Sequence, residues 1–250
     1  MDSSPVLRAD LHVHTIASGH AYSTIEEVCE AASGRFDAIA ITDHGPAMPG
    51  GPHVYHFSNL LVLPGTIRGV RVFKGAECNI LDSSGLLDLH FRVIRSLDIV
   101  LAAIHPFCGY EGSSEEENTR AVVNAVKSGM VDVLAHPCNP LYPVDYTRVV
   151  RAAAEHRVAL EVNNASFTVV RKGSEGNCRA ILAEAVRTGA FISVGSDAHH
   201  ATMVGWLDRA QAMVEQAGID PGQVINRNLD SVIEFLKIRG KDIDPGGYNY

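Results

Sequence analysis

Short runs of β-branched and other apolar residues recur along the chain and alternate with stretches whose apolar positions have helical spacing. This alternation is typical of a parallel sheet whose strands are joined by crossover helices. The predicted strands are Val6 to Val13, Asp37 to Thr42, Val70 to Ala76, Ile99 to Ile104, Val131 to Ala135, Val158 to Val162 and Phe191 to Val194. Seven strands favour a closed or nearly closed β/α barrel over an open sheet.

Polar capping residues predict where several helices begin. Thr24 and Glu27 form a plausible capping box, and Ser113 or Ser114 precedes an acidic first turn of a helix that runs to Lys127. Further helices are expected after Asp145, from Asn177 to Gly189, from about Gly205 to Gln216 and from Leu229 to Arg239. Between the elements we expect a long loop at Gly45 to Pro64, a small hairpin at Ile80 to Leu89 and an irregular tail from Asp242.

Length and composition indicate an ordinary globular chain. Of the 250 residues, 46% are hydrophobic and 20% are charged, and no linker or low-complexity tract is visible. Because β/α barrels of this length form one domain, we expect a single domain over residues 1–250 with its core at about 7–240. The net charge of −8 argues against extended nucleic-acid binding. It is compatible with a small phosphorylated substrate, because metal ions can supply positive charge.

Cysteine usage and the N-terminus indicate the compartment. The five cysteines are widely spaced and include no C-x-x-C pair, which suits a reduced cytoplasm better than a disulfide framework. No secretory signal and no apolar run of membrane-spanning length is visible, so we expect a cytoplasmic protein without membrane contact. A homo-oligomer is compatible with the sequence.

Metal-binding or polar side chains follow all seven predicted strands. They are His12 and His14, Asp43 and His44, Glu77, His105, His136, Asn163 and Asn164, and finally Asp197 and His199. The carboxyl ends of parallel barrel strands share one face, so these groups are expected to meet there. His12 and His14 stand two apart in a strand and point to the same side. Imidazole and carboxylate ligands without thiolate suit zinc, manganese or iron, and we interpret the neighbouring Cys78 and Cys138 as small buried hydrophobes.

The segments DLHVHT, ITDHG, KGAECNI, AIHPF, LAHPCNP, LEVNN and GSDAH resemble, in this order, the motifs of the PHP (polymerase and histidinol phosphatase) family. The resemblance extends from about Leu7 to the C-terminal helix and is closest to the stand-alone bacterial phosphatases of the YcdX type. It implies a distorted (βα)7 barrel with three divalent metal ions per chain, zinc being preferred and manganese or iron the alternatives.

Carried over position by position, the resemblance implies nine metal ligands. His12, His14, Glu77 and Asp197 hold the first ion, Glu77 bridges to a second ion held by His105 and His136, and His20, His44 and His199 hold the third. The chain departs from close relatives at Pro106, which directly follows His105 where they have an acidic residue, so the shape of the next loop is open. His200 is an alternative to His199, which we prefer because the Asp-x-His spacing places it on the side of Asp197.

The predicted reaction is hydrolysis of a phosphate monoester of a small molecule by a metal-bridging hydroxide. Glu77 is expected to fix the separation of two ions, and Asp197 is expected to orient the hydroxide as well as bind metal. Arg171 and Lys172 are candidate phosphate contacts, and a solvated basic loop is an equal alternative for them. His53 and His56 either line the substrate pocket, donate hydrogen bonds to ligands, or pack within their loop. No protein general acid is evident.

Three other functions fit parts of the pattern. A metal-dependent amidohydrolase also begins with HxH, but its bridging carbamylated lysine has no counterpart here, because the bridging position falls on Glu77. A nuclease acting on DNA or RNA ends is disfavoured by the net acidity. A noncatalytic metal-storage or regulatory module is disfavoured by the complete ligand set.

Overall fold

The chain folds around a sheet of parallel strands, in a computed structural model that describes residues 7–110, 112, 114–168 and 170–243. The strand order is β1-β2-β4-β5-β6-β7-β8. The bounds are β1 Ala9–Val13, β2 Ala38–Ile41, β4 Val70–Asn79, β5 Ile99–Ala103, β6 Val133–Leu134, β7 Ala159–Asn163 and β8 Ile192–Gly195. The seven predicted strands and the barrel class are therefore confirmed. A further short strand, β3 (Thr66–Ile67), pairs antiparallel with β4 and is too short to give a sequence pattern.

The strand bounds differ from the predicted ones in ways that matter for the site. β4 continues to Asn79, so Glu77 lies inside a strand rather than after its end. β1 begins at Ala9, and Val6, where the predicted run starts, lies outside the described residues. The register between β1 and β2 shifts between Asp10 and Val13, as in a β-bulge. Bulges re-aim side chains and are common next to active sites.

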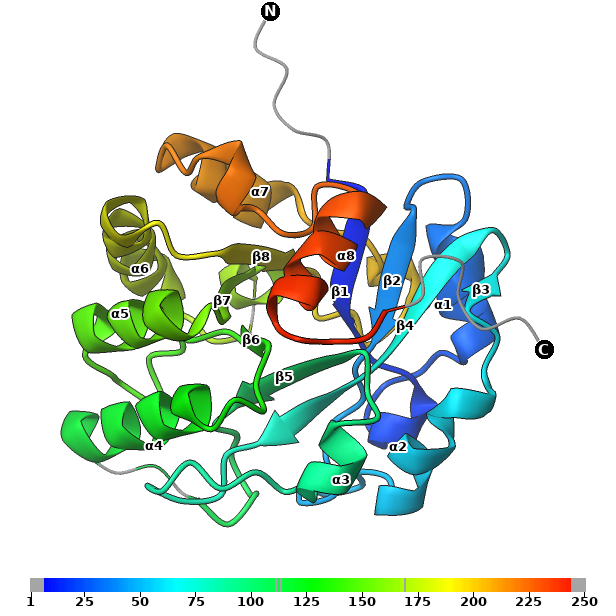
Figure 1. The fold of residues 1–250 in the computed structure, drawn as a ribbon, viewed down its shortest axis with the longest axis horizontal. Helices are drawn as coiled ribbons and strands as arrows, with labels where there is room; N and C mark the ends of the chain where they lie inside the picture. Colours follow the sequence, from blue (N-terminus) through cyan, green and yellow to red (C-terminus); the bar gives the residue numbers. More distant parts are fainter. Residues whose placement is uncertain (1–6, 111, 113, 169, 244–250) are drawn as a thin grey trace, which may run out of the picture.

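Two apolar layers lie on either side of the sheet. Inside the barrel, Leu11, Phe73 and Leu101 pack with other strand residues and with α8 (Leu229–Ile238), whose buried face includes Phe235. The same cluster includes Ala9, Ala38 and Ile99, the first residues of β1, β2 and β5, so α8 covers the amino ends of the strands (in red in Figure 1). On the opposite side, polar side chains such as His12 and Glu77 lie toward the carboxyl ends of β1 and β4.

The other helices pack outside the sheet, with α4, α5 and α6 in a row (Figure 1). They are α1 Ile25–Ala32, α2 Val54–Asn59, α3 Phe91–Ile94, α4 Glu115–Lys127, α5 Tyr146–His156, α6 Ser174–Thr188 and α7 Asp208–Gln216. The predicted capping box of α1 is present, and Ser114 caps α4, whereas Ser113 lies outside the described residues.

Three sequence expectations about these elements need correction. The segment from Gly45 to Pro64 is not all loop, because it contains α2 and the 3-10 turn Leu60–Val62. α6 begins at Ser174 rather than Asn177, since the side chain of Asn177 donates to the Cys138 carbonyl instead of capping the helix. α7 begins at Asp208, about one turn after the predicted start.

The barrel closes between β1 and β8 with little direct strand pairing. The backbone there is joined by the Val13–Ala198 bridge, in which the His14 amide donates to the Ala198 carbonyl over 2.9 Å. Below this bridge the buried side chain of Asn226 fills the gap: its amide donates to the carbonyls of Ala9 and Val194, and its oxygen accepts from the Val194 amide. The side chain of Asn226 thus supplies hydrogen bonds that direct pairing of β1 with β8 would otherwise make. We call this boundary the β1–β8 seam.

The five cysteines are buried, and none of them forms a disulfide: Cys29, Cys78, Cys108, Cys138 and Cys178. Within the described part of the chain, the helices are too short or too polar to cross a membrane.

Candidate metal centre

The first group of converging side chains comes from β1, β4 and the turn after β8. The Nε2 atoms of His12 and His14 lie 3.1 Å apart, because Val13 between them faces the outer layer. Glu77 Oε2 lies 3.3 Å from His12 Nε2 and 3.5 Å from His14 Nε2. Asp197 Oδ1 approaches the same two nitrogens at 3.5 and 3.2 Å. The four side chains predicted to share one ion therefore surround one point.

The second group uses the other oxygen of the same glutamate. Glu77 Oε1 lies 2.9 Å from His136 Nε2 and 3.2 Å from His105 Nε2, and the two imidazole nitrogens are 3.3 Å apart. Glu77 is completely buried, and its two oxygens face different sets of histidines. This is the arrangement that the family resemblance implies for a bridging carboxylate.

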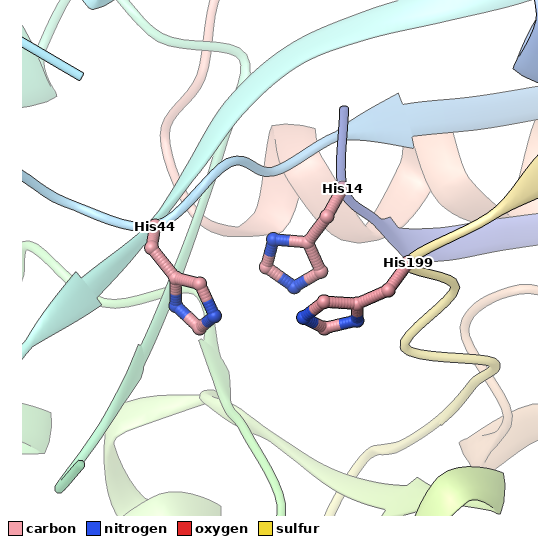
Figure 2. Close-up of side chains that lie close together, drawn as sticks. All are labelled: His14, His44 and His199. Atoms are coloured by element: carbon pink, nitrogen blue, oxygen red, sulfur yellow. The ribbon is translucent and has the colours of Figure 1, made fainter. Parts of the chain in front are cut away.

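The third predicted group is only partly assembled. The ring of His20 lies with its centroid 5.0 Å from that of His44 and 4.9 Å from that of His199, so the three are neighbours. The nitrogens that approach one another most closely, however, belong to His14, His44 and His199, whose rings turn toward a common space in Figure 2. His44 Nδ1 also lies 2.9 Å from Glu77 Oε2. His20 is the exposed member, and it belongs to none of the close ligand groups among the described residues. The neighbouring His200 caps a 3-10 turn instead.

Hydrogen-bond partners behind the histidines fix which nitrogen carries the proton. His12 Nδ1 lies 2.7 Å from Glu161 Oε1, and His105 Nδ1 lies 2.8 Å from Asn79 Oδ1. Both oxygens can only accept, so each Nδ1 donates and each Nε2 faces the cluster. His14 Nδ1 reaches Ser18 Oγ, whose single proton goes to Asp43, and the same assignment follows. Oriented in this way, imidazoles are ready to bind cations through Nε2.

The sequence did not single out Glu161, Asn79 or Ser18. Glu161 lies inside the strand β7 and is completely buried, and its second oxygen accepts from the His136 amide and from Asn163. A carboxylate within a buried strand is rare without a partner, and that anomaly is the signal that could have identified it.

Burial and mutual charge set the protonation of the cluster. Burial and the nearby His44 lower the pKa of His14 to about 3, and burial lowers the pKa of His136 to about 4, so both are neutral at pH 7. Burial alone would raise the pKa of Glu77, but the charges of His105, His12 and His44 hold it well below the ordinary value. His14 and His136 are therefore neutral beside the ionised Glu77, and these are the forms that bind metal ions.

His12 is the exception. Burial, the largest single influence, lowers its pKa, but the combined charges of Glu161, Glu77 and Asp197 raise it well above the ordinary value. A proton on His12 and a metal ion are alternative ways to balance the same carboxylates, so binding of a cation is expected to displace this proton.

Comparison with known proteins identifies the family. The PHP domain profile matches residues 10–170. A probable phosphatase of Caldanaerobacter subterraneus subsp. tengcongensis is 46% identical over 238 residues, which are 95% of this chain and 94% of that protein. The chain belongs to the PHP domain family. A probable phosphatase of Acetivibrio thermocellus is 47% identical over 229 residues, 91% of this chain and 94% of that protein.

A solved structure supports the fold of this PHP domain. Histidinol phosphate phosphatase of Lactococcus lactis subsp. lactis, in complex with zinc, L-histidinol and phosphate, superposes with a TM-score of 0.58 at 16% identity, over 85% of this chain and 94% of that one. The predicted family and enzyme class are confirmed: the protein is a phosphatase-type hydrolase of the PHP family.

Of the four residues predicted to contact substrate, two line a cavity at the site and two do not. Arg171 and Lys172 line a cavity of about 940 Å³ above the histidine cluster. Arg171 is largely buried, and its Nη2 lies 2.8 Å from Asp197 Oδ2. His56 Nε2 faces Asp43 Oδ2 at 3.3 Å, behind the ligands. His53 caps α2 through Nδ1 and is not part of the cavity lining.

Two buried atoms without hydrogen bonds test whether the cluster suits metal ions. Glu77 Oε2 and His44 Nδ1 have no hydrogen-bond partner, although they lie 2.9 Å from each other. Unpaired buried polar atoms are costly, and here they converge with lone pairs from neighbouring imidazoles. Cations placed among them would satisfy these atoms, and the N and O donors suit divalent ions. The donor set of the PHP domain therefore fits divalent metals.

Proposed function

We propose that this protein is a metal-dependent phosphatase that hydrolyses phosphate monoesters of small molecules with three divalent ions bound at the carboxyl ends of its strands. His12, His14, Glu77 and Asp197 would hold the first ion; Glu77, His105 and His136 the second; and His20, His44 and His199 the third. The proximity of His14 to His44 and His199 makes His14 an additional neighbour of the third position.

The observation that carries this proposal is the placement of Glu77. Its Oε1 faces His105 and His136, and its Oε2 faces His12, His14 and His44, all within 3.5 Å. A buried carboxylate divided in this way between two sets of imidazoles is suited to bridge two cations. Bound divalent ions supply charge neutralisation for the phosphate and lower the pKa of bound water toward about 7. Zinc is our preferred ion because the ligands are mainly imidazoles, with manganese and iron as alternatives.

Arg171 is placed to bind the phosphate group of a substrate and to orient Asp197. Besides Asp197, the Arg171 guanidinium approaches Asn163 Oδ1 and Ser166 Oγ at 3.5 and 3.4 Å. A guanidinium has five N–H donors, more than these three acceptors use, so it can also donate to a phosphate oxygen in the cavity. Arg171 and Asn163 hold Asp197 Oδ2 and thereby turn Oδ1 toward the histidines. The pKa of Asp197 lies well below its ordinary value because the charges of His12 and Arg171 outweigh the effect of burial.

Backbone strain supports the view that this region is built for chemistry. Four of the six non-glycine residues with positive φ in the described ranges surround the site: Phe107, His136, Arg171 and Asp197, at 64°, 31°, 53° and 56°. Such conformations cost about 1–3 kcal/mol each and persist where the surroundings enforce them, commonly at active sites.

Two measurements test the proposal. Metal content should be close to three ions per chain in protein prepared without chelators, and a value of zero or one would remove the cluster from consideration. p-Nitrophenyl phosphate should be hydrolysed by this protein, and a chelator should stop the reaction while the circular dichroism spectrum stays that of a folded chain. Loss of activity only on unfolding would count against metal-dependent catalysis.

Substitution of the bridging residue is the sharpest genetic test. Glu77→Ala should abolish turnover and reduce metal content, because both bridged positions lose a ligand. Glu234→Ala removes an exposed glutamate from α8, at the other end of the barrel, and should change neither quantity. Equal activity of the two variants would refute the role given to Glu77.

A further inference from the structure

The cavity above the histidine cluster is much larger than a phosphoryl group requires. It encloses about 940 Å³, which is the size of a site for an organic ligand. The histidines and Asp197 form its polar side. The surrounding wall is apolar and includes Met48, Phe107, Pro140, Leu141, Val170 and Met203. The part of a substrate that extends from the phosphate would therefore meet apolar side chains.

Several of these apolar side chains are exposed at the same place. Phe107 is 76% exposed, Leu141 64% and Val170 47%, although large apolar groups usually avoid water. Clustered exposed apolar residues that border a polar site commonly mark a ligand-binding surface. An aromatic ring at such a position offers a flat face on which another ring can stack.

The backbone holds Phe107 in its exposed position. Its φ of 64° is rare for a bulky residue, and the next residue, Cys108, directs its thiol to Asn79 Oδ1 at 3.2 Å. The same Asn79 oxygen accepts from His105. The turn that presents Phe107 is thus tied to Asn79, the residue that orients a proposed metal ligand, so the backbone at Phe107 is held beside the cluster.

The charges in the cavity limit the substrate further. Among the described residues that line it, the cations besides the histidines are Arg171 and Lys172, and the only carboxylate is Asp197, which is already paired with Arg171. A positively charged group on the substrate would face Lys172 without a free carboxylate to bind it. A neutral or anionic group would not incur this repulsion.

We infer that the preferred substrates are phosphate monoesters of aromatic or other apolar alcohols without positive charge, and that Phe107 is the residue that selects them. This inference rests on the proposed phosphatase function. It distinguishes this site from one for an amino alcohol phosphate, which would need a carboxylate near the amine.

Three alkyl phosphates of similar intrinsic reactivity test the selection: 2-phenylethyl phosphate, glycerol 3-phosphate and phosphoethanolamine. With the metal-loaded protein, kcat/KM should be highest for the phenylethyl ester, by about tenfold over glycerol 3-phosphate. Phosphoethanolamine should be the poorest of the three. A preference for phosphoethanolamine, or equal values for all three, would overturn the inference.

Variants then assign the selection to named residues. Phe107→Ala should reduce the ratio of kcat/KM for the phenylethyl ester to that for glycerol 3-phosphate about tenfold, and Phe107→Tyr should restore it. Phe91→Ala, which removes a partly exposed phenylalanine of α3 outside the cavity lining, should leave the ratio unchanged. Lys172→Glu should raise kcat/KM for phosphoethanolamine relative to glycerol 3-phosphate.

The outcomes separate the two proposals. If no ester releases phosphate in a metal-dependent way, the proposed function itself fails. If all three are hydrolysed but the ratio does not respond to Phe107→Ala, the phosphatase assignment stands and the selective role of Phe107 is refuted.

Discussion

At the scale of single residues, the histidines of this PHP domain depend on their hydrogen-bond partners. We predict that Glu161→Gln weakens metal binding about 10- to 100-fold. The present carboxylate accepts from His12, from the His136 amide and from Asn163, and a glutamine would place N–H donors against one or more of these donors. Competition with a chromophoric chelator measures the affinity.

The matched control for this variant is Glu175→Gln, which makes the same chemical change on the exposed surface of α6. It should bind metal like the unmodified protein. Identical metal affinities for the two variants would show that Glu161 does not set the state of His12.

Eight of the nine proposed ligands were located because each lies at or near the end of a predicted strand, and their side chains converge closely in the structure. His20 could not be placed in the same way, since it lies in a turn beyond β1 whose path depends on Gly19 and its neighbours. Glu161 and Asn79 were missed because they occupy strand positions that read as core. Their role appears only when neighbouring strands bring His12 and His105 to them.

At the scale of elements, α1 depends on its N-terminal cap. Thr24 accepts from the Glu27 amide, and Glu27 accepts from the Thr24 amide and hydroxyl. Thr24→Ala should lower the free energy of unfolding by about 1 kcal/mol in urea denaturation. Thr147→Ala, at an exposed position of α5, should not lower it. An equal loss in both variants would contradict a specific cap.

The contribution of this cap should also depend on pH. The Thr24 backbone and side chain lower the pKa of Glu27, so the folded chain favours the ionised form. Stabilisation is then present above the pKa of glutamate in the unfolded chain, near 4.5, and is lost as the pH falls through the lower folded value. The difference in stability between Thr24→Ala and the unmodified protein should therefore shrink in acid.

The amphipathic helices and the apolar strands were predictable because their periodicity is local. α2 was missed because its surroundings are rich in glycine, proline and histidine, and its six residues are too few for a helical pattern. The start of α6 was misplaced because the sequence does not show that Asn177 bonds to the Cys138 carbonyl, on a different part of the chain. The exact start of such a helix is set by tertiary contacts, which the sequence does not show.

At the scale of the whole molecule, closure of the barrel depends on Asn226. Asn226→Ala should lower the free energy of unfolding by about 1–3 kcal/mol or more, because the carbonyls of Ala9 and Val194 and the Val194 amide lose their partner in the interior. Denaturant titration measures the loss. Asn59→Ala, at an exposed position of α2, should be neutral. A neutral result for Asn226→Ala would mean that the β1–β8 seam holds without it.

The β1–β8 seam also crosses the proposed metal site. His12 lies in β1 and His14 directly follows it, whereas Asp197 and His199 follow β8, so ions bound between them would fasten the first strand of the chain to the last. Removal of the metal ions should then weaken the connection between β1 and β8. Amide hydrogen exchange at His14 and Ala198 should quicken on chelation, while exchange in β5, which pairs along its whole length with β4, should change little. Metal binding and closure of the barrel at the β1–β8 seam would then depend on each other.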